Sequence, residues 1–118
     1  MIRRGIKWIL LFDSVDELDQ LFNIRDTAPY KNILGSFMFV KTAEAYLAFE
    51  NKCPHQNKPL DGCWIEENRI VCPMHRYAFD LTNGRGHGMA LKQYPIKIVD
   101  NQVYFGKETW LFGRTQKD

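Results

Sequence analysis

Hydrophobic positions along the chain fall into short runs that predict strands rather than helices. Such runs occupy residues 7–12, 37–41, 45–50, 69–72, 94–99 and 103–105. The second and third runs are separated only by a short polar stretch, as in a hairpin. The last two are joined across the turn Asp100-Asn101, a pair typical of hairpin turns. The pattern therefore predicts at least two antiparallel hairpins.

One segment departs from this pattern and predicts a helix over residues 14–22. Ser14 and Glu17 have the spacing of a capping box, and Leu18, Leu21 and Phe22 follow at helical intervals. Many short strands with a single short helix indicate an all-β fold, an antiparallel sandwich or barrel. We find no repeat or linker, so we expect one domain over residues 1–118.

Composition narrows the class of protein further. The chain has 118 residues, of which 45% are hydrophobic and 25% charged, which is typical of a globular domain. A net charge of +2 gives no reason to expect binding to nucleic acid or to a membrane surface. The apolar run over residues 8–12 ends at Asp13 and is too short for a signal peptide or a membrane span. With three cysteines, an odd number, we expect a cytoplasmic protein with reduced thiols.

The chemistry of the chain is concentrated between residues 53 and 80, which hold all three cysteines and two of the three histidines. Two short segments have matching character there, Cys53-Pro54-His55 and Cys72-Pro73-Met74-His75. Each offers one thiolate and one imidazole. Sixteen residues separate His55 from Cys72. Two segments that repeat the same ligand types indicate a metal site more than two buried cysteines and incidental histidines.

Two kinds of metal site are compatible with these ligands. A structural zinc ion accepts two cysteines and two histidines, but its usual spacing places both cysteines together and both histidines on a helix. Here Cys and His alternate, and neither pair has helical spacing. A two-iron cluster can instead take two cysteines on one iron and two histidines on the other. This alternative fits the order of the residues best.

The arrangement C-x-H-x16-C-x2-H resembles the motif of the Rieske-type 2Fe–2S proteins, and in particular their soluble, low-potential ferredoxins. The similarity extends to flanking residues across roughly positions 45–106. These are Pro59-Leu60, Phe79-Asp80, Asn83-Gly84 and the segment Tyr94-Pro95-Ile96-Lys97-Ile98. The resemblance implies an antiparallel β-fold with a small cluster-binding subdomain, here about residues 51–88.

The same resemblance implies the ligands of one 2Fe–2S cluster per chain. Cys53 and Cys72 would bind one iron, and His55 and His75 would bind the iron nearer to solvent. We expect no catalytic residue. In high-potential relatives each loop carries an additional cysteine, and hydroxyl groups follow the second histidine. The matching positions here are Lys58, Met74, Tyr77 and Phe79, so we expect a midpoint potential at the low end of the Rieske range, roughly −150 mV.

Several residues near the motif need separate predictions. Cys63 lies outside both segments, and we expect a buried or half-buried free thiol. We expect His87, in the sequence GRGHG, to be a surface histidine, while its glycines would let this third loop approach the cluster. Related ferredoxins have glycine where this chain has Asn57 and Arg76. Asparagine tolerates a left-handed backbone, whereas arginine is a departure from the family pattern.

The resemblance implies an electron carrier rather than an enzyme by itself. It would pass electrons from a flavin-containing reductase to a terminal oxygenase, as the ferredoxin components of ring-hydroxylating dioxygenases do. An alternative is the small Rieske-like subunit of an assimilatory nitrite reductase, whose partner is the large subunit. A zinc-stabilised binding module without redox function is an alternative of another class. Four cations would surround the cluster, either as a docking patch or as ordinary solvated surface charge: Lys52, Lys58, Arg76 and Arg85.

Overall fold

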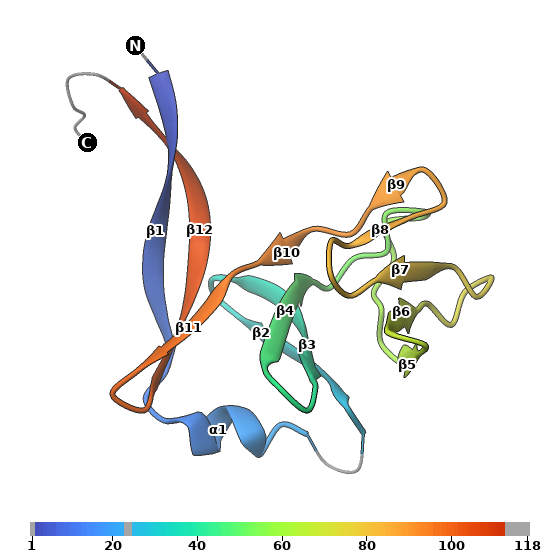
Figure 1. The fold of residues 1–118 in the computed structure, drawn as a ribbon, viewed down its shortest axis with the longest axis horizontal. Helices are drawn as coiled ribbons and strands as arrows, with labels where there is room; N and C mark the ends of the chain where they lie inside the picture. Colours follow the sequence, from blue (N-terminus) through green and yellow to red (C-terminus); the bar gives the residue numbers. More distant parts are fainter. Residues whose placement is uncertain (1, 23–24, 113–118) are drawn as a thin grey trace.

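The computed structural model describes residues 2–22 and 25–112, with side chains over residues 5–22 and 25–108. The described chain forms one helix, α1 (Val15–Asp19), and a series of antiparallel strands (Figure 1). The longer strands are β1 (Ile2–Phe12), β2 (Thr27–Asn32), β3 (Gly35–Lys41), β4 (Tyr46–Glu50), β11 (Ile96–Val99) and β12 (Gln102–Phe112). The short strands are β5 (Trp64–Glu66), β6 (Arg69–Val71), β7 (Ala78–Asp80), β8 (Arg85–Gly86), β9 (Met89–Ala90) and β10 (Gln93–Tyr94). The prediction of an all-β antiparallel fold is confirmed.

The strands form two larger sheets and two small ones. The outer sheet has the order β1-β12-β11, and the central sheet has the order β10-β4-β3-β2. The strands β5-β6-β7 and the pair β8-β9 belong to a region that we call the small lobe, residues 51–91. Figure 1 shows the outer sheet at one end of the molecule, the small lobe at the other, and the central sheet between them. The central sheet therefore connects the two regions.

Strand β3 explains why the central sheet can hold the two regions together. Four consecutive residues of this strand, 37–40, are all buried, as expected for a strand covered on both faces. Phe37 and Phe39 belong to the core shared with the outer sheet and α1, whereas Met38 and Val40 belong to the core of the small lobe. Alternate residues of a strand point to opposite faces, so one apolar run serves two cores.

Both hairpins that the sequence predicted are present. Strands β3 and β4 pair from Phe37 opposite Glu50 to Lys41 opposite Tyr46. Strands β11 and β12 are joined by Asp100 and Asn101, whose φ angles of 51° and 68° are those of a type I′ turn. Helix α1 begins after Ser14, whose side chain accepts a hydrogen bond from the Glu17 backbone N–H (3.3 Å). The helix is shorter than the predicted 14–22, and Leu18 is its buried residue.

Strands β1 and β12 are longer than the sequence indicated. They pair over their whole length, from Ile2 opposite Phe112 to Phe12 opposite Val103. The part of this pair that projects past β11 includes Arg3, Arg4 and Gly5, which interrupt the apolar pattern in the sequence. The strand β2 was not predicted, because Pro29 interrupts its pattern; proline is tolerated here since β2 is at the edge of its sheet. No helix among the described residues has the length and apolar character needed to cross a membrane.

Candidate metal centre

The two Cys–His segments lie on two loops of the small lobe that close in the same way. The first loop connects β4 to β5, and the second connects β6 to β7. In the first, the Cys53 backbone N–H donates a hydrogen bond to the Lys58 carbonyl (2.7 Å). In the second, the Cys72 N–H donates to the Tyr77 carbonyl, also at 2.7 Å. Both hydrogen bonds join a cysteine to the residue five positions later. The two loops therefore have the same backbone closure around their ligands.

Left-handed backbone conformations make these tight loops possible. Asn57 and Arg76 each follow their cysteine by four residues and have φ angles of 59° and 58°. His75 also has a positive φ of 65°. Arg76 therefore adopts the conformation for which glycine is favoured, at a steric cost of about 1 kcal/mol. Its guanidinium lies over the Trp64 ring, 5.3 Å from the centroid, which is a favourable cation–π distance.

The folded loops bring the four predicted ligands together as two pairs. Cys53 and Cys72 are buried in the lobe core, where their thiols are neighbours. The rings of His55 and His75 lie edge to face, with centroids 5.3 Å apart. His75 is exposed and His55 is half-buried. The sulfur pair is thus inside the lobe, and the imidazole pair lies toward solvent.

The environment of these groups fits a metal cluster. Nδ1 of His55 is buried and has no hydrogen-bond partner, which is costly unless another ligand occupies that position. Burial raises the pKa of the Cys72 thiol, the Met74 backbone N–H lowers it, and the adjacent Cys53 raises it further. Two buried thiols that form no disulfide, beside an unpartnered imidazole nitrogen, match the donor set of a mixed Cys–His iron–sulfur site.

The remaining candidate residues are placed as the sequence indicated. Cys63 is fully buried and unpaired, and burial raises its pKa to about 11. Cys63 also lies outside both Cys–His segments. His87 is exposed. Among the described residues, no group of three or more His, Cys, Asp or Glu side chains could hold a single ion.

Several residues that shape the site were missed at the level of the sequence. Asn51 stabilises the first loop, because its Oδ1 accepts from the Leu60 N–H (2.6 Å) and its Nδ2 donates to Asp61 (2.8 Å). An asparagine at the start of a loop is a recognisable signal for such bonding. The Tyr77 ring packs against the His55 ring, with centroids 4.1 Å apart and 38° between the planes. That contact joins residues from different loops, so local patterns could not have shown it.

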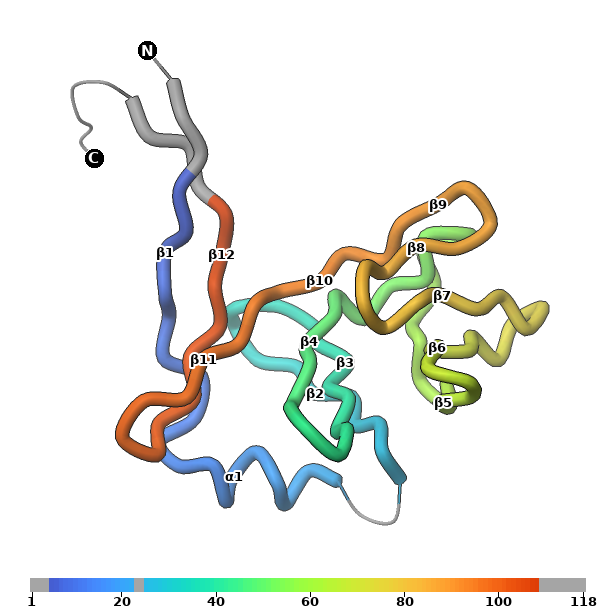
Figure 2. The backbone as a smooth tube through the Cα atoms, in the orientation of Figure 1, coloured from blue at the N-terminus to red at the C-terminus, as the bar shows by residue number. Residues whose placement is uncertain are grey.

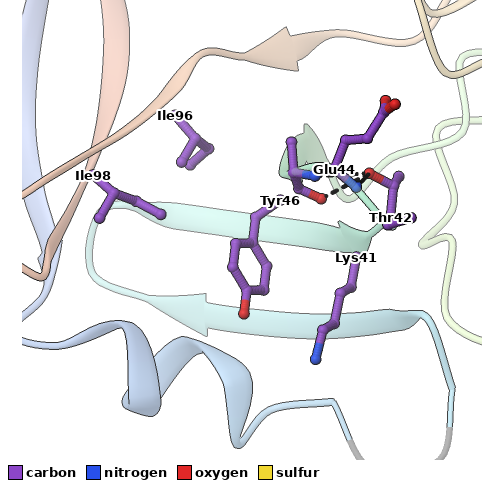
Figure 3. A pocket seen from close by; sticks show the side chains of 8 residues that line it. Lys41, Thr42, Glu44, Tyr46, Ile96 and Ile98 are labelled. Carbon is purple, nitrogen blue, oxygen red and sulfur yellow. Dashed lines mark hydrogen bonds between the residues drawn. The ribbon is translucent and has the colours of Figure 1, made fainter.

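A pocket elsewhere in the molecule is unrelated to these loops. It lies between the β3–β4 turn and β11, and its wall includes Lys41, Thr42, Tyr46, Ile96 and Ile98 (Figure 3). The Thr42 hydroxyl is bonded within the turn, to the Ala45 carbonyl (3.0 Å). Lys41 and Tyr46 both bond to Asp19, at 2.6 and 2.9 Å. Lys41 and Tyr46 therefore hold the hairpin against α1.

Two curated proteins are similar in sequence to this chain. The chain is 34% identical over 68 residues to iodate reductase subunit IdrB of Pseudomonas sp. (strain SCT). The aligned region covers 49% of this chain and 34% of that protein. It is 30% identical over 83 residues to the ferredoxin component of the 2,4-dinitrotoluene dioxygenase system of Burkholderia sp. (strain RASC). Here the aligned region covers 67% of this chain and 78% of that protein. The chain thus spans about a third of the first relative and most of the second.

Solved structures share the fold at low sequence identity. The ferredoxin of carbazole 1,9a-dioxygenase from Nocardioides aromaticivorans IC177 has a TM-score of 0.62 at 20% identity, over 81% of this chain and 92% of that one. A putative NADH-dependent nitrite reductase small subunit from Mycobacterium tuberculosis has a TM-score of 0.67 at 11% identity, over 87% and 96%. The model of the Rieske [2Fe-2S] domain matches residues 15–98, a range that includes both Cys–His loops. The chain therefore belongs to the Rieske [2Fe-2S] domain family, and its cofactor is a 2Fe–2S cluster.

Proposed function

We propose that the chain is a one-electron carrier, whose cluster accepts an electron from a flavin-containing reductase and passes it to a terminal oxygenase. Cys53 and Cys72 hold one iron, and His55 and His75 hold the other. The observation that carries this proposal is the sorting of the four side chains into a buried thiol pair and an outer imidazole pair. The carrier is one domain over residues 1–118, with residues 51–88 as the cluster-binding subdomain and no catalytic residue of its own.

Mixed ligation accounts for the chemistry that such a cluster supplies. Neutral imidazoles in place of two thiolates make the site less negative, so an electron is added more easily than to an all-cysteine cluster. Burial of Cys53 and Cys72 keeps water from the sulfur end. The exposed His75 and half-buried His55 give the electron a short path to the surface. A partner therefore has to dock over the two loops that carry these histidines.

The choice of partner rests on the relatives. One relative in sequence is the ferredoxin component of a dioxygenase system. A solved structure of similar fold is a complex of reduced oxygenase and oxidized ferredoxin (TM-score 0.64, 16% identity). A second candidate is the small subunit of a nitrite reductase, favoured by the TM-score of 0.67 to such a subunit. In that case the partner is a nitrite reductase large subunit. The setting in either case is the cytoplasm, without a nucleic acid or membrane partner.

Charge around the loops supports docking to an acidic surface. Lys52, Lys58, Arg76 and Arg85 are all exposed. Exposed charges act mainly on association rate, through attraction that salt screens over about 8 Å at physiological ionic strength. Because the Arg76 guanidinium also lies over Trp64, the two lysines are better targets for a test of charge alone.

The function is tested by stopped-flow reduction of the protein by a dioxygenase-type flavin reductase, followed by oxidation by its oxygenase. We expect both steps to be fast at low salt and slower as salt is added. Lys52→Glu with Lys58→Glu should slow them without changing the visible spectrum. The matched control is Lys31→Glu with Lys107→Glu, which makes the same charge change on exposed positions of β2 and β12. Transfer to a nitrite reductase but not to an oxygenase would favour the second candidate.

A further inference from the structure

The sequence GRGHG forms β8 and the turn of the β8–β9 hairpin, and this hairpin packs on the end of the second ligand loop. Figure 2 shows β8 beside β7, the strand that follows that loop, with β9 on the other side of β8. Gly86 makes the close approach possible, because a Cβ at this position would collide with the carbonyl oxygen of Ala78. The hairpin is thus fitted to the first residue of β7 by backbone contact.

His87, at the tip of the hairpin, makes two further contacts to the same place. Its Nε2 accepts a hydrogen bond from the Ala78 backbone N–H (3.2 Å). Its ring stacks on the Tyr77 ring, with centroids 4.6 Å apart and 23° between the planes. His87 holds a positive φ of 56°, which is uncommon for a residue with a side chain and is maintained by these contacts.

Tyr77 in turn contacts both ligand loops. Its carbonyl accepts the Cys72 N–H and closes the second loop, while its ring packs on His55 of the first loop at 4.1 Å. The rings of His55, Tyr77 and His87 therefore form a column with Tyr77 in the middle. His55 is also the residue whose buried Nδ1 has no partner in the protein. The orientation of that nitrogen depends on the packing of Tyr77.

We propose that His87 is a positioning residue for the cluster: it holds Tyr77 against His55 and so fixes the orientation of a ligand that it does not touch. This proposal rests on the proposed ligand role of His55. Without His87, Tyr77 is free to turn outward, and water reaches the imidazole end of the site. Two thiolates neutralise an oxidised 2Fe–2S core, so the reduced site carries the net charge. Added water therefore favours the reduced state and raises the midpoint potential.

His87→Gly is the primary test, because glycine removes the ring and the acceptor while accepting the positive φ. We expect a higher midpoint potential, faster loss of the cluster to a chelator, and hydrogen exchange at Ala78 faster by about three- to tenfold, the effect of one lost hydrogen bond. Thr82→Ala, an exposed and uncharged change in the turn after β7, is the control.

Two partial replacements separate the ring from the hydrogen bond. His87→Phe keeps the stacking surface and should restore the potential, whereas His87→Gln keeps only an acceptor and should restore exchange protection alone. A potential in His87→Gly equal to that of Thr82→Ala, or its restoration by Gln but not by Phe, would overturn the proposal. Failure of the proposed function is distinct, because the unsubstituted protein would then hold its cluster but not pass electrons to the oxygenase, whatever the potentials of the His87 variants.

Discussion

The two ends of the molecule are stabilised in different ways. The core between the outer and central sheets is built from aromatic rings, and Phe37 is at its centre. This ring packs against Phe39, Tyr94 and Phe105, with centroid distances of 5.8, 5.4 and 5.1 Å. The strands there are up to eleven residues long. This end has the contacts that a domain needs to fold without a ligand.

The small lobe differs in its strands and in its backbone conformations. Its strands have only two or three residues each. Six residues other than glycine have positive φ angles there: Asn57, Glu67, Asn68, His75, Arg76 and His87. Its core includes three cysteines, two of which are proposed cluster ligands. The comparison indicates that backbone strain and short strands are tolerated in the lobe because the cluster joins its two loops.

Loss of one cluster ligand should therefore give the largest difference in hydrogen-exchange protection between the two ends. In Cys72→Ala we expect loss of the visible absorbance and rapid hydrogen exchange throughout the small lobe, with protection retained in β1, β3, β4 and β12. Hydrogen-exchange mass spectrometry of the purified variant measures both regions at once. Cys63→Ser is the control, since this buried thiol lies outside the ligand pairs and its variant should keep the cluster. Equal loss of protection at both ends would contradict the comparison.

A cavity at the aromatic end should lower the stability of the fold and leave the cluster site unchanged. Phe37→Ala removes a ring that is 1% exposed, and we expect the free energy of unfolding to fall by about 3–5 kcal/mol. The visible spectrum of the folded fraction should remain unchanged. Denaturant titration with detection by far-UV circular dichroism gives the value. Ile33→Ala, at a fully exposed position in the β2–β3 turn, should change stability by less than about 0.5 kcal/mol.

Strain in the second loop predicts a smaller effect. Replacing Arg76 by glycine removes the left-handed penalty, whereas replacing it by alanine keeps the penalty and loses the contact with Trp64. We expect Arg76→Gly to be more stable than Arg76→Ala by about 1 kcal/mol. Both variants lose the same cation–π contact, so their difference reports the backbone alone. Equal stabilities in thermal unfolding would mean that the loop relaxes when the arginine is absent.

The smallest effect concerns the ion pair between α1 and β3. Hydrogen bonds from Lys41 (2.6 Å) and then Tyr46 lower the pKa of Asp19 from 3.8. Because the pKa of Asp19 is lower in the folded state, the carboxylate stabilises the fold at pH values above its pKa in the unfolded state. This contribution is lost as the pH falls through the pKa of the folded state. The pair is exposed, so the effect should be small. Asp19→Asn should lower Tm slightly at neutral pH and match the unsubstituted protein at pH about 2; a difference that persists in acid would contradict this account.

The sequence predicted what depends on local pattern. The β3–β4 and β11–β12 hairpins followed from apolar runs and from turn residues that favour a left-handed backbone. The four proposed ligands followed from the repetition of Cys and His, since the chemistry needs those residue types. The free thiol of Cys63, which is buried, was predicted from its place outside both Cys–His segments.

The sequence did not show features that depend on distant contacts. Arg76 departed from the glycine expected at its position, yet the loop keeps a left-handed conformation there, supported by the ring of Trp64. The column of His55, Tyr77 and His87 combines residues from three separate segments. The full length of β1 and β12 was hidden because charged residues and glycine interrupt the apolar pattern where the two strands pair mainly with each other.

The central claim is that two thiols hold one iron and two imidazoles hold the other. The most direct measurement is Mössbauer spectroscopy of the protein enriched in ⁵⁷Fe, combined with analysis of iron and acid-labile sulfide. We predict two inequivalent iron sites in equal amounts, with iron and sulfide in a one-to-one ratio. A single type of iron site, or zinc without sulfide, would contradict the assignment of Cys53, His55, Cys72 and His75.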